Sequence, residues 1–459
     1  MEPDTIVARA TPPGIGAVAL VRLSGPRAME IVSGLLGPDQ RPPGERTAAL
    51  RSLTDPESGE PLDRSVVLYF PGPASYTGED VVEISTHGGT LVPDGVVEAC
   101  VRAGARRAEA GEFTQRAYLN GKLDLVQAEA VHDLIEGRSP VARRTALHQM
   151  EGGLSRRVAE IRDGLVSLEA LLVHHLDFPD EDDPPVPVSE LRDRGMELAG
   201  RLEALRRTAP EGMLLREGAL VVLAGPPNAG KSSLFNALVG TERAIVTAVP
   251  GTTRDAIEAP LSIGGFPFRL VDTAGIRGDA GEIEQMGIEV ARRYLEGAQL
   301  VLYCHRAAEP WGPDERAMLQ ELGPERTVVL ATCIDEAEGT AAEQEGAGAG
   351  PPGTEELRVS VYDGTGLDAL RRRLEERAFG GLRGLADDGG VVTRARQLRS
   401  IETALTEIGA FARGLDEGVP VEFAATHLRP AETALEELLG IIDPEEVLDR
   451  VFREFCVGK

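Results

Sequence analysis

Aromatic residues are scarce in this chain of 459 residues: Phe, Trp and Tyr make up 4%, with a single Trp. This scarcity argues against a protein that stacks nucleobases along an aromatic platform. Basic residues are outnumbered by acidic ones, and the formal net charge is −27. Broad non-specific attraction to nucleic acid or to anionic lipid is therefore disfavoured.

Closely spaced cysteines are also lacking. Cys100, Cys304, Cys333 and Cys456 lie far apart and form no CxxC pair, which excludes a zinc-ligand pattern or a disulfide framework. No apolar run approaches the ~18 residues that span a bilayer, and the first residues have no basic flank followed by an apolar run. With 42% hydrophobic residues the chain can bury real cores. We expect a soluble, cytoplasmic protein with no membrane association.

Short apolar runs predict an N-terminal α/β domain. Ile15 to Leu23, Ser65 to Phe70 and Asp80 to Ile84 have the composition of strands, and Val92 to Ala103 that of a helix. Further on, apolar residues recur every three or four positions, which predicts one long helix: Leu147, Met150, Leu154, Val158, Ile161, Leu165, Leu168 and Leu172. A proline-rich acidic segment, 177–188, ends this pattern, and a second helix follows with Ser189 as its N-cap.

From about Gly218 to Ala378 the pattern changes to short apolar strands that alternate with helices, which predicts a parallel sheet. Helical spacing returns after this module, from Leu398 to Phe411. Because helical sequence flanks the module on both sides, we interpret it as an α/β domain inserted into a helical domain.

The inserted module contains the pattern GxxxxGK[ST] from Gly225 to Ser232, between an apolar strand and an apolar helix. In this context the glycines let backbone amides surround a phosphate, Lys231 reaches the β and γ oxygens, and Ser232 ligates magnesium. A glycine-rich turn without function is the alternative interpretation of this pattern alone.

Two further motifs support a nucleotide site. Gly251-Thr-Thr-Arg-Asp255 offers a threonine for the magnesium shell, and Asp272-Thr-Ala-Gly275 offers a carboxylate to the metal and a glycine amide to the γ-phosphate. Three phosphate-handling motifs in this order indicate a P-loop NTPase of the translation-factor-like GTPase class.

The segment expected to recognise guanine is only partly matched. An Asn-Lys-x-Asp motif would be expected after a late strand, but here the residues are Thr332-Cys333-Ile334-Asp335. Asp335 is retained and can accept from the guanine ring, while Thr332 and Cys333 leave weakened guanine affinity or selectivity as an alternative. Ser360 lies where a Ser-Ala-Lys loop would be expected.

The residue that would orient the attacking water is also altered, because Ile276 stands where Ras-like enzymes have glutamine. Asn228 can hold a monovalent cation beside the β and γ phosphates, or it forms a loop-shaping hydrogen bond. Glu284 lies in the segment that follows the Asp272 motif, and taken alone a solvated helix residue is its simpler interpretation.

Four sequence blocks resemble the MnmE (TrmE) family of tRNA-modification GTPases, from Asp4 to Lys459. They are DTIVARATPPGIGAVALVRLSG near the start, SYTGEDVVEISTHGG at 75–89, GEFTQRAYLNGKLDLVQAEAV at 111–131 and the terminal FCVGK. The resemblance implies a multidomain α+β protein. Its predicted parts are an N-terminal α/β folate-binding and dimerisation domain at 1–122, a discontinuous helical domain at 123–216 and 380–459 that ends in FCVGK, and an inserted Ras-like P-loop GTPase domain at 217–379.

The resemblance also implies roles for individual residues. Glu284 would be the catalytic glutamate, Cys456 a functional thiol, and Ser232 and Thr253 the magnesium ligands. Potassium would be held by Asn228, Thr247, Val249 and Thr252, and a tetrahydrofolate one-carbon derivative by Arg22, Glu83, Lys122 and Lys459. The predicted GTP-binding residues are Asn228, Ala229, Gly230, Lys231, Ser232, Ser233, Thr247, Ala248, Val249, Pro250, Gly251, Thr252, Thr253, Asp272, Thr273, Ala274, Gly275, Asp335 and Ser360.

The function implied by the resemblance is that of a potassium-dependent GTPase that modifies the wobble uridine of certain tRNAs. The chain would form a homodimer and, with a flavin-dependent MnmG-like partner, a heterotetramer. GTP hydrolysis would be coupled to dimerisation of the GTPase modules. Two alternatives stay open: a ribosome-assembly GTPase switch without modification chemistry, and a family member with reduced guanine preference.

Overall fold

The computed structural model describes residues 4–37, 39–177, 186–242, 258–272, 282–337, 356–382, 390–442, 448, 451–453 and 455–458, without the side chains of 174–177, 241–242, 282–288 and 337. The chain forms two compact units. The first combines Met1–His132 with Leu435–Lys459, and the second is Asp133–Ala434.

A six-stranded sheet forms the centre of the first unit, with the strand order β3-β4-β5-β2-β1-β6. All neighbouring strands are antiparallel except β1 and β6. The strands are β1 (Ile6–Arg9), β2 (Val18–Ser24), β3 (Ala49–Thr54), β4 (Pro61–Phe70), β5 (Val81–His87) and β6 (Arg106–Arg107). The expected strands are present as β2, β4 and β5. β2 begins at Val18 rather than at Ile15, and Ile15 is fully exposed.

Alternation of side chains along these strands separates the two faces of the sheet. One face, with Val21, Leu23 and Ile84, packs against α1 (Ala28–Gly34) and α2 (Leu91–Arg102) in a closed apolar core. Residues one step out of phase, such as Arg22 and Glu83, belong to the opposite face. There Ile6 and Ala8 cluster with Phe113 of α3 (Glu112–Leu119). The sequence therefore places its charged positions away from the main core.

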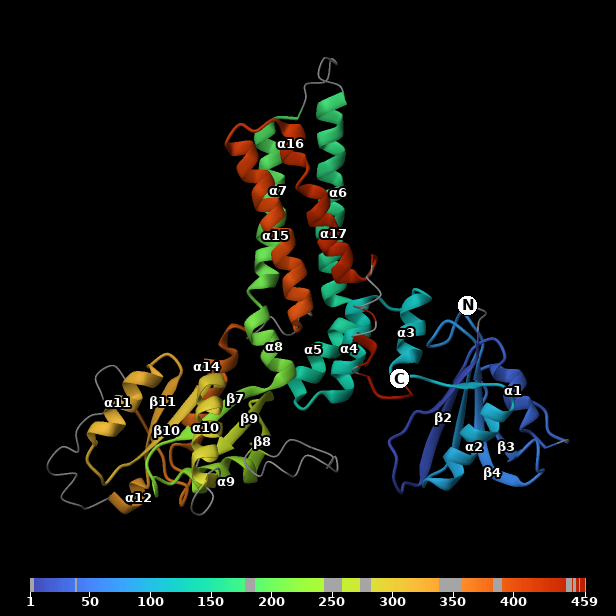
Figure 1. Cartoon of the computed structure of the whole chain (residues 1–459), viewed down its shortest axis with the longest axis horizontal. Helices are drawn as coiled ribbons and strands as arrows, with labels where there is room; N and C mark the ends of the chain where they lie inside the picture. Colours follow the sequence, from blue (N-terminus) through green and yellow to red (C-terminus); the bar gives the residue numbers. More distant parts are fainter. Residues whose placement is uncertain are drawn as a thin grey trace. The chain divides into compact units, whose positions relative to one another are not determined.

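Helices on both sides of the inserted module build the helical part of the second unit. Figure 1 shows α6, α7 and α15 side by side, in agreement with their contacts. Gly164 and Gly195 permit this close packing, because a Cβ at Gly164 would lie 2.6 Å from a methyl carbon of Leu198 and one at Gly195 would lie 3.1 Å from the Phe411 ring. The helices are α5 (Pro140–Met150), α6 (Gly153–Asp177), α7 (Val188–Arg206), α8 (Ala209–Glu217), α15 (Ala395–Asp416) and α16 (Val421–Ala425); α4 (Leu125–Glu136) and α17 (Leu428–Leu439) include residues of both units.

Two details of the helix predictions were wrong. The apolar stripe that starts at Leu147 is divided between α5 and α6, because Gly152 adopts a left-handed φ of 84° and ends the continuous helix. Ser189 does not cap the next helix. The N-cap position is Pro187, whose fixed φ suits an entry to the helix, and α7 already begins at Val188.

The inserted module has a second six-stranded sheet, with the order β12-β11-β10-β7-β9-β8. It is parallel, as predicted, except that β8 runs antiparallel to β9 at the edge. Apolar clusters cover both faces, which explains why β7 and β11 are buried along their whole length. The elements are β7 (Ala219–Ala224), α9 (Lys231–Glu242), β8 (Glu258–Ile263), β9 (Phe266–Asp272), α10 (Glu282–Gly297), β10 (Leu300–Arg306), α11 (Pro313–Leu322), β11 (Thr327–Thr332), α12 (Ile334–Ala337), β12 (Glu356–Arg358), α14 (Leu367–Phe379) and η2 (Gly380–Leu382).

Candidate functional site

The loop between β7 and α9 has the backbone shape of a phosphate-binding loop. Gly225 has a φ of 128°, and a Cβ there would lie only 2.1 Å from the Cys304 carbonyl oxygen, so no other residue fits. Asn228 and Gly230 also have positive φ values, 62° and 77°. These left-handed positions curl the loop so that α9 begins directly after it, where the N-terminal end of a helix attracts an anion.

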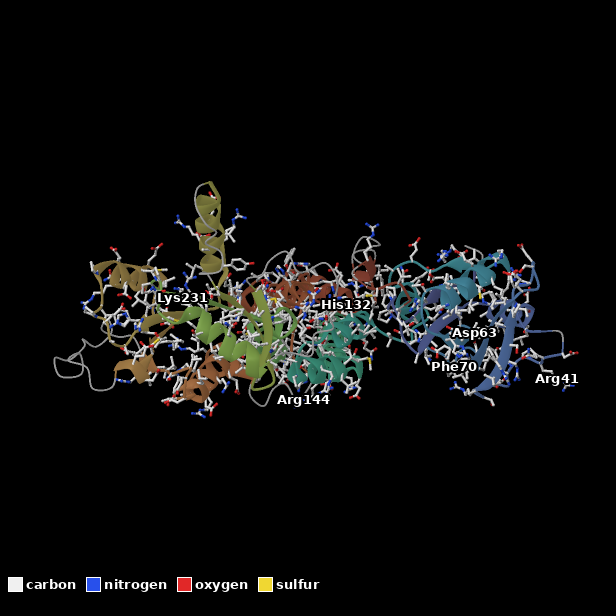
Figure 2. All side chains as sticks on the ribbon, turned by 90° about the horizontal axis from the view of Figure 1, so that it is seen from below. Arg41, Asp63, Phe70, His132, Arg144 and Lys231 are labelled. Atoms are coloured by element: carbon white, nitrogen blue, oxygen red, sulfur yellow. The ribbon has the colours of Figure 1, made fainter. Side chains whose placement is uncertain are left out.

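Lys231 and Ser232 are the first residues of α9, directly after the loop. Lys231, labelled in Figure 2, is 6% exposed, and its ammonium donates to the carbonyl oxygens of Gly225 (2.9 Å) and Pro226 (2.6 Å). Ser232 Oγ donates to Asp272 Oδ2 at 2.7 Å, at the end of β9. The fold thus brings together the hydroxyl and the carboxylate that were predicted to share a magnesium ion.

Asp335 and Ser360, the two residues predicted to recognise the base, are also adjacent. Ser360 is fully buried after β12, and its hydroxyl donates to Asp335 Oδ1 at 2.7 Å. The hydroxyl also accepts from the Tyr362 backbone N–H at 3.2 Å. Asp335 is exposed at the start of α12, so its carboxylate is held in place while it still faces solvent.

Thr332, the last residue of β11, and Cys333, which follows it, lie beside the phosphate loop. Thr332 Oγ1 lies 2.8 Å from the Ala229 carbonyl oxygen and 3.0 Å from that of His305. Burial raises the pKa of the Cys333 thiol, and it raises that of Cys304 to about 12, so both thiols are protonated at neutral pH. We interpret them as packing groups rather than nucleophiles.

Other predicted site residues of the module lie outside the described residues. These are Thr247, Ala248, Val249, Pro250, Gly251, Thr252, Thr253, Thr273, Ala274 and Gly275. Glu284 lies on α10, but its side chain is likewise outside the described part. Of the potassium positions, only Asn228 is described, with an exposed side chain in the loop.

In the first unit, Arg22 and Glu83 form a cross-strand ion pair on the sheet face opposite the main core. They are paired in the register of β2 and β5, and Arg22 Nε and Nη2 lie 3.0 and 2.7 Å from Glu83 Oε1. The guanidinium lies 5.5 and 5.7 Å from the ring centroids of Tyr76 and Phe113. Burial raises the pKa of Tyr76. Charge and aromatic surface are therefore combined in one partly buried place.

Lys122 and Cys456 also belong to this unit. Lys122 is exposed and its ammonium donates to the Pro73 carbonyl oxygen at 3.0 Å. Cys456 is exposed in the C-terminal segment. Within the first unit this segment pairs with the N-terminal part of the chain through the bridge between Ala110 and Val457. A Cβ at Gly458 would lie 2.5 Å from the Arg9 carbonyl oxygen, so the segment passes close to the end of β1. Lys459 lies outside the described residues.

Sequence reasoning overlooked one compositional signal. The chain has only three lysines, Lys122, Lys231 and Lys459, although lysine and arginine together number 48. All three occupy predicted ligand-binding positions. The ammonium group is a compact point charge and the guanidinium is a broad fork, so the two side chains are not interchangeable at a ligand. The scarcity of lysine is the compositional signal that singles out these three positions.

The described residues contain neither a metal-binding cluster nor a membrane helix. Among them, no group of three or more His, Cys, Asp or Glu side chains is placed to hold a metal ion. None of the helices in the described part of the chain combines the length and the apolar character needed to cross a bilayer.

Comparison with known proteins identifies the family. The family model "GTP-binding protein TrmE N-terminus" matches residues 5–122, and the model "MnmE helical domain" matches residues 125–456. The tRNA modification GTPase MnmE of Moorella thermoacetica is 39% identical over 99% of both chains, and that of Phenylobacterium zucineum is 43% identical over 99% of this chain and 100% of its own.

Among solved structures, the G domain of the FeoB iron transporter of T. maritima is 30% identical. It covers 35% of this chain and 98% of its own, with a TM-score of 0.25. The predicted fold class is confirmed: a TrmE N-terminal domain, a helical domain and a P-loop α/β module are combined in one chain. The chain belongs to the MnmE family of tRNA modification GTPases.

Proposed function

We propose that this chain hydrolyses GTP and uses the hydrolysis in modification of the wobble uridine of certain tRNAs. The group added at C5 would be of the carboxymethylaminomethyl or aminomethyl type. The observation that carries the proposal is the curled β7–α9 loop with Lys231 inside it and the Ser232–Asp272 contact at its end, in a member of this family. GTP hydrolysis would drive movement of the modules and would not itself form the new carbon bond.

Ser232, Asp272 and Thr253 fit a magnesium site by their chemistry. A hydroxyl and a carboxylate 2.7 Å apart supply the hard oxygen ligands that magnesium prefers. When bound, the ion would neutralise charge on the phosphates. Lys231 would turn its ammonium from the loop carbonyls to the β and γ oxygens, while backbone amides of residues 228–233 surround the phosphates.

The missing glutamine requires another source of catalysis, and we assign it to Asn228 and Glu284. Asn228 is exposed in the loop, and with Thr247, Val249 and Thr252 it would complete an oxygen-rich potassium site. The cation would supply the positive charge that an arginine finger provides elsewhere. Glu284 would orient the attacking water from α10. Docking of two GTPase modules would complete this arrangement, so turnover would depend on dimerisation.

Arg22, Glu83, Lys122 and Lys459 are the proposed ligands of a tetrahydrofolate one-carbon derivative. Tyr76, beside the Arg22–Glu83 pair, offers an aromatic surface for a pterin ring. Both contacts from Arg22 are made to Glu83 Oε1, and we propose that the carboxylate accepts hydrogen bonds from the pterin. The lysines would meet the carboxylates of the glutamate tail. Cys456, exposed in the C-terminal segment, is a proposed functional thiol near the carrier.

A titration tests this proposed carrier site. Replacing Glu83 with Gln is expected to weaken the binding of a formyl-tetrahydrofolate by about tenfold or more, because a charged hydrogen-bond acceptor is lost. Glu30→Gln is the matched control, since Glu30 forms an exposed ion pair with Arg27 in the same unit. Equal affinity for the wild type and for Glu83→Gln would contradict the assignment.

The proposed homodimer would form through the first unit. Three apolar residues of its sheet are exposed to solvent: Val18 (64%), Leu50 (48%) and Val66 (39%). Leu50 and Val66 are paired across β3 and β4, so they form a continuous surface. Burial of such a surface against a second copy would be favourable. The other proposed partners are a flavin-dependent MnmG-like subunit, in a heterotetramer, and tRNA, in the cytoplasm.

The division of the chain follows from the same proposal. We assign residues 1–122 to carrier binding and dimerisation, 217–379 to GTP hydrolysis, and 123–216 with 380–459 to the helical domain that connects them. The C-terminal residues from Leu435 are in the compact unit of the N-terminal residues, which supports a role of the terminal FCVGK beside the one-carbon carrier.

A reconstituted modification assay tests the proposed function. The full-length chain, an MnmG-type partner, GTP, the one-carbon carrier and unmodified tRNA are expected to yield a modified wobble uridine by mass spectrometry of the nucleosides. Omission of this chain or replacement of GTP by GDP is expected to abolish the product. GTP turnover with no modified nucleoside in the complete mixture would instead favour the ribosome-assembly alternative.

A further inference from the structure

The last residue of β11, Thr332, connects two loops of the nucleotide site. Its side chain is buried, and its hydroxyl lies within hydrogen-bond distance of the carbonyl oxygens of Ala229 and His305, at 2.8 and 3.0 Å. Ala229 belongs to the phosphate loop, whereas Asp335 follows Thr332 by three residues. A hydroxyl has a single proton, so it donates to one of the two carbonyls or is shared between them.

The two loops also approach each other beside this hydrogen bond. A Cβ added at Gly230 would come to ordinary van der Waals distance of the segment, 3.5 Å from Cys333 Sγ and 3.6 Å from Thr332 Cβ, so only the space of a methyl group separates the glycine from these side chains. The segment from Thr332 to Asp335 is short. It ends in a turn in which the Glu336 N–H donates to the Cys333 carbonyl oxygen at 3.1 Å. Its start therefore lies beside the phosphate loop, joined to it by the Thr332 hydroxyl.

The other end of the segment is fixed independently. Ser360, fully buried, donates to Asp335 Oδ1 at 2.7 Å. Asp335 is thus held by Ser360 on one side and, through the backbone, by Thr332 on the other. Loss of the Thr332 hydroxyl would leave the Ala229 carbonyl oxygen without this buried donor, and a buried acceptor that loses its donor costs free energy.

We propose that Thr332 is a positioning residue for base recognition, whose hydroxyl ties the Asp335 segment to the phosphate loop in place of the asparagine expected there. This inference rests on the proposed binding of GTP. It assigns to Thr332 a part in purine selection, so the departure from Asn-Lys-x-Asp does not abolish the preference for guanine. Thr332 acts through Asp335 and touches no base atom itself.

Nucleotide titrations of the full-length chain test the proposal. Dissociation constants for fluorescent GDP and ADP are measured for the wild type, Thr332→Val and Thr332→Ser. Thr332→Val keeps the shape but loses the hydroxyl, and it is expected to weaken GDP binding about tenfold. ADP binding, which depends mainly on the phosphates, is expected to change less, so the GDP preference falls. Thr332→Ser keeps the donor and is expected to stay within about twofold of the wild type.

Thr327→Val is the matched control. Thr327 is also buried, at the start of the same strand, and its hydroxyl has no hydrogen-bond partner in the described structure. This variant is expected to bind both nucleotides like the wild type. Circular dichroism checks folding, and Thr332→Ala replaces Thr332→Val in the comparison if the valine variant does not fold.

Three results would overturn the inference. The first is unchanged GDP affinity in Thr332→Val, and the second is an equal loss for GDP and ADP, which would indicate a merely structural role. The third is a failure of Thr332→Ser to keep the wild-type preference. A wild-type chain that binds no guanine nucleotide would overturn both this inference and the proposed function, whereas the other results leave the proposed function intact.

Discussion

A Lys231→Ala protein is expected to hydrolyse GTP about 10²–10³-fold more slowly than the wild type, in kcat/KM, because the charged group that we propose turns to the developing phosphate charge is lost. The ammonium lies inside the phosphate loop, where it donates to the Gly225 and Pro226 carbonyl oxygens. The substitution removes it from a place that is largely shielded from water. Phosphate release at saturating and subsaturating GTP measures the effect.

Two variants make this result specific. Lys231→Arg is expected to remain impaired, because the guanidinium is broader than the ammonium and Lys231 is buried. Arg292→Ala removes an exposed positive charge from α10 and is expected to hydrolyse GTP at the wild-type rate. A Lys231→Ala protein that retained turnover within about threefold of the wild type would be incompatible with a phosphate-binding role, since charged transition-state contacts contribute far more.

A Glu284→Ala protein is expected to lose about 10²-fold in kcat, the usual scale for a positioned carboxylate that acts on a water. Nucleotide affinity is expected to change less than about twofold, because Glu284 is assigned to the water and not to GTP. Single-turnover hydrolysis and a GDP titration separate the two effects.

Glu289→Ala is the matched control for Glu284, since Glu289 is an exposed glutamate on the same helix. It is expected to leave both kcat and GDP affinity unchanged. If Glu284→Ala also turned over GTP normally, the assignment of Glu284 would be wrong and the water would have to be oriented by another group.

Strands with continuous apolar sequence could be predicted from the sequence, because burial on both faces leaves an unmistakable pattern. Ala219–Ala224 and Thr327–Thr332 are such strands. The strand Glu258–Ile263 lacks this pattern, because it is an edge strand with a proline, Pro260, and only partial burial. The break at Gly152 was missed because helical periodicity continues across it, and its cause is a backbone angle.

More of the nucleotide site than of the proposed carrier site could be predicted from the sequence. Lys231 and Ser232 are neighbours in the chain, and the motif order brings Asp272 to the same edge of a parallel sheet, so their proximity follows from topology. The pairing of Arg22 with Glu83 depends on the register of two antiparallel strands, which residue types alone do not fix. The hydrogen bond from Thr332 to the Ala229 carbonyl oxygen could not be predicted either, since the sequence shows only that an asparagine is absent.

The most direct test of the account is GTP turnover by the wild-type chain in potassium chloride and in sodium chloride at equal ionic strength, over a range of protein concentrations. We predict that turnover is faster in potassium by about tenfold or more, because the proposed potassium ion would replace a catalytic guanidinium. We also predict that the rate per chain rises with concentration as GTPase modules dock in pairs. Equal rates in both salts, from a chain that stays monomeric throughout, would contradict the account.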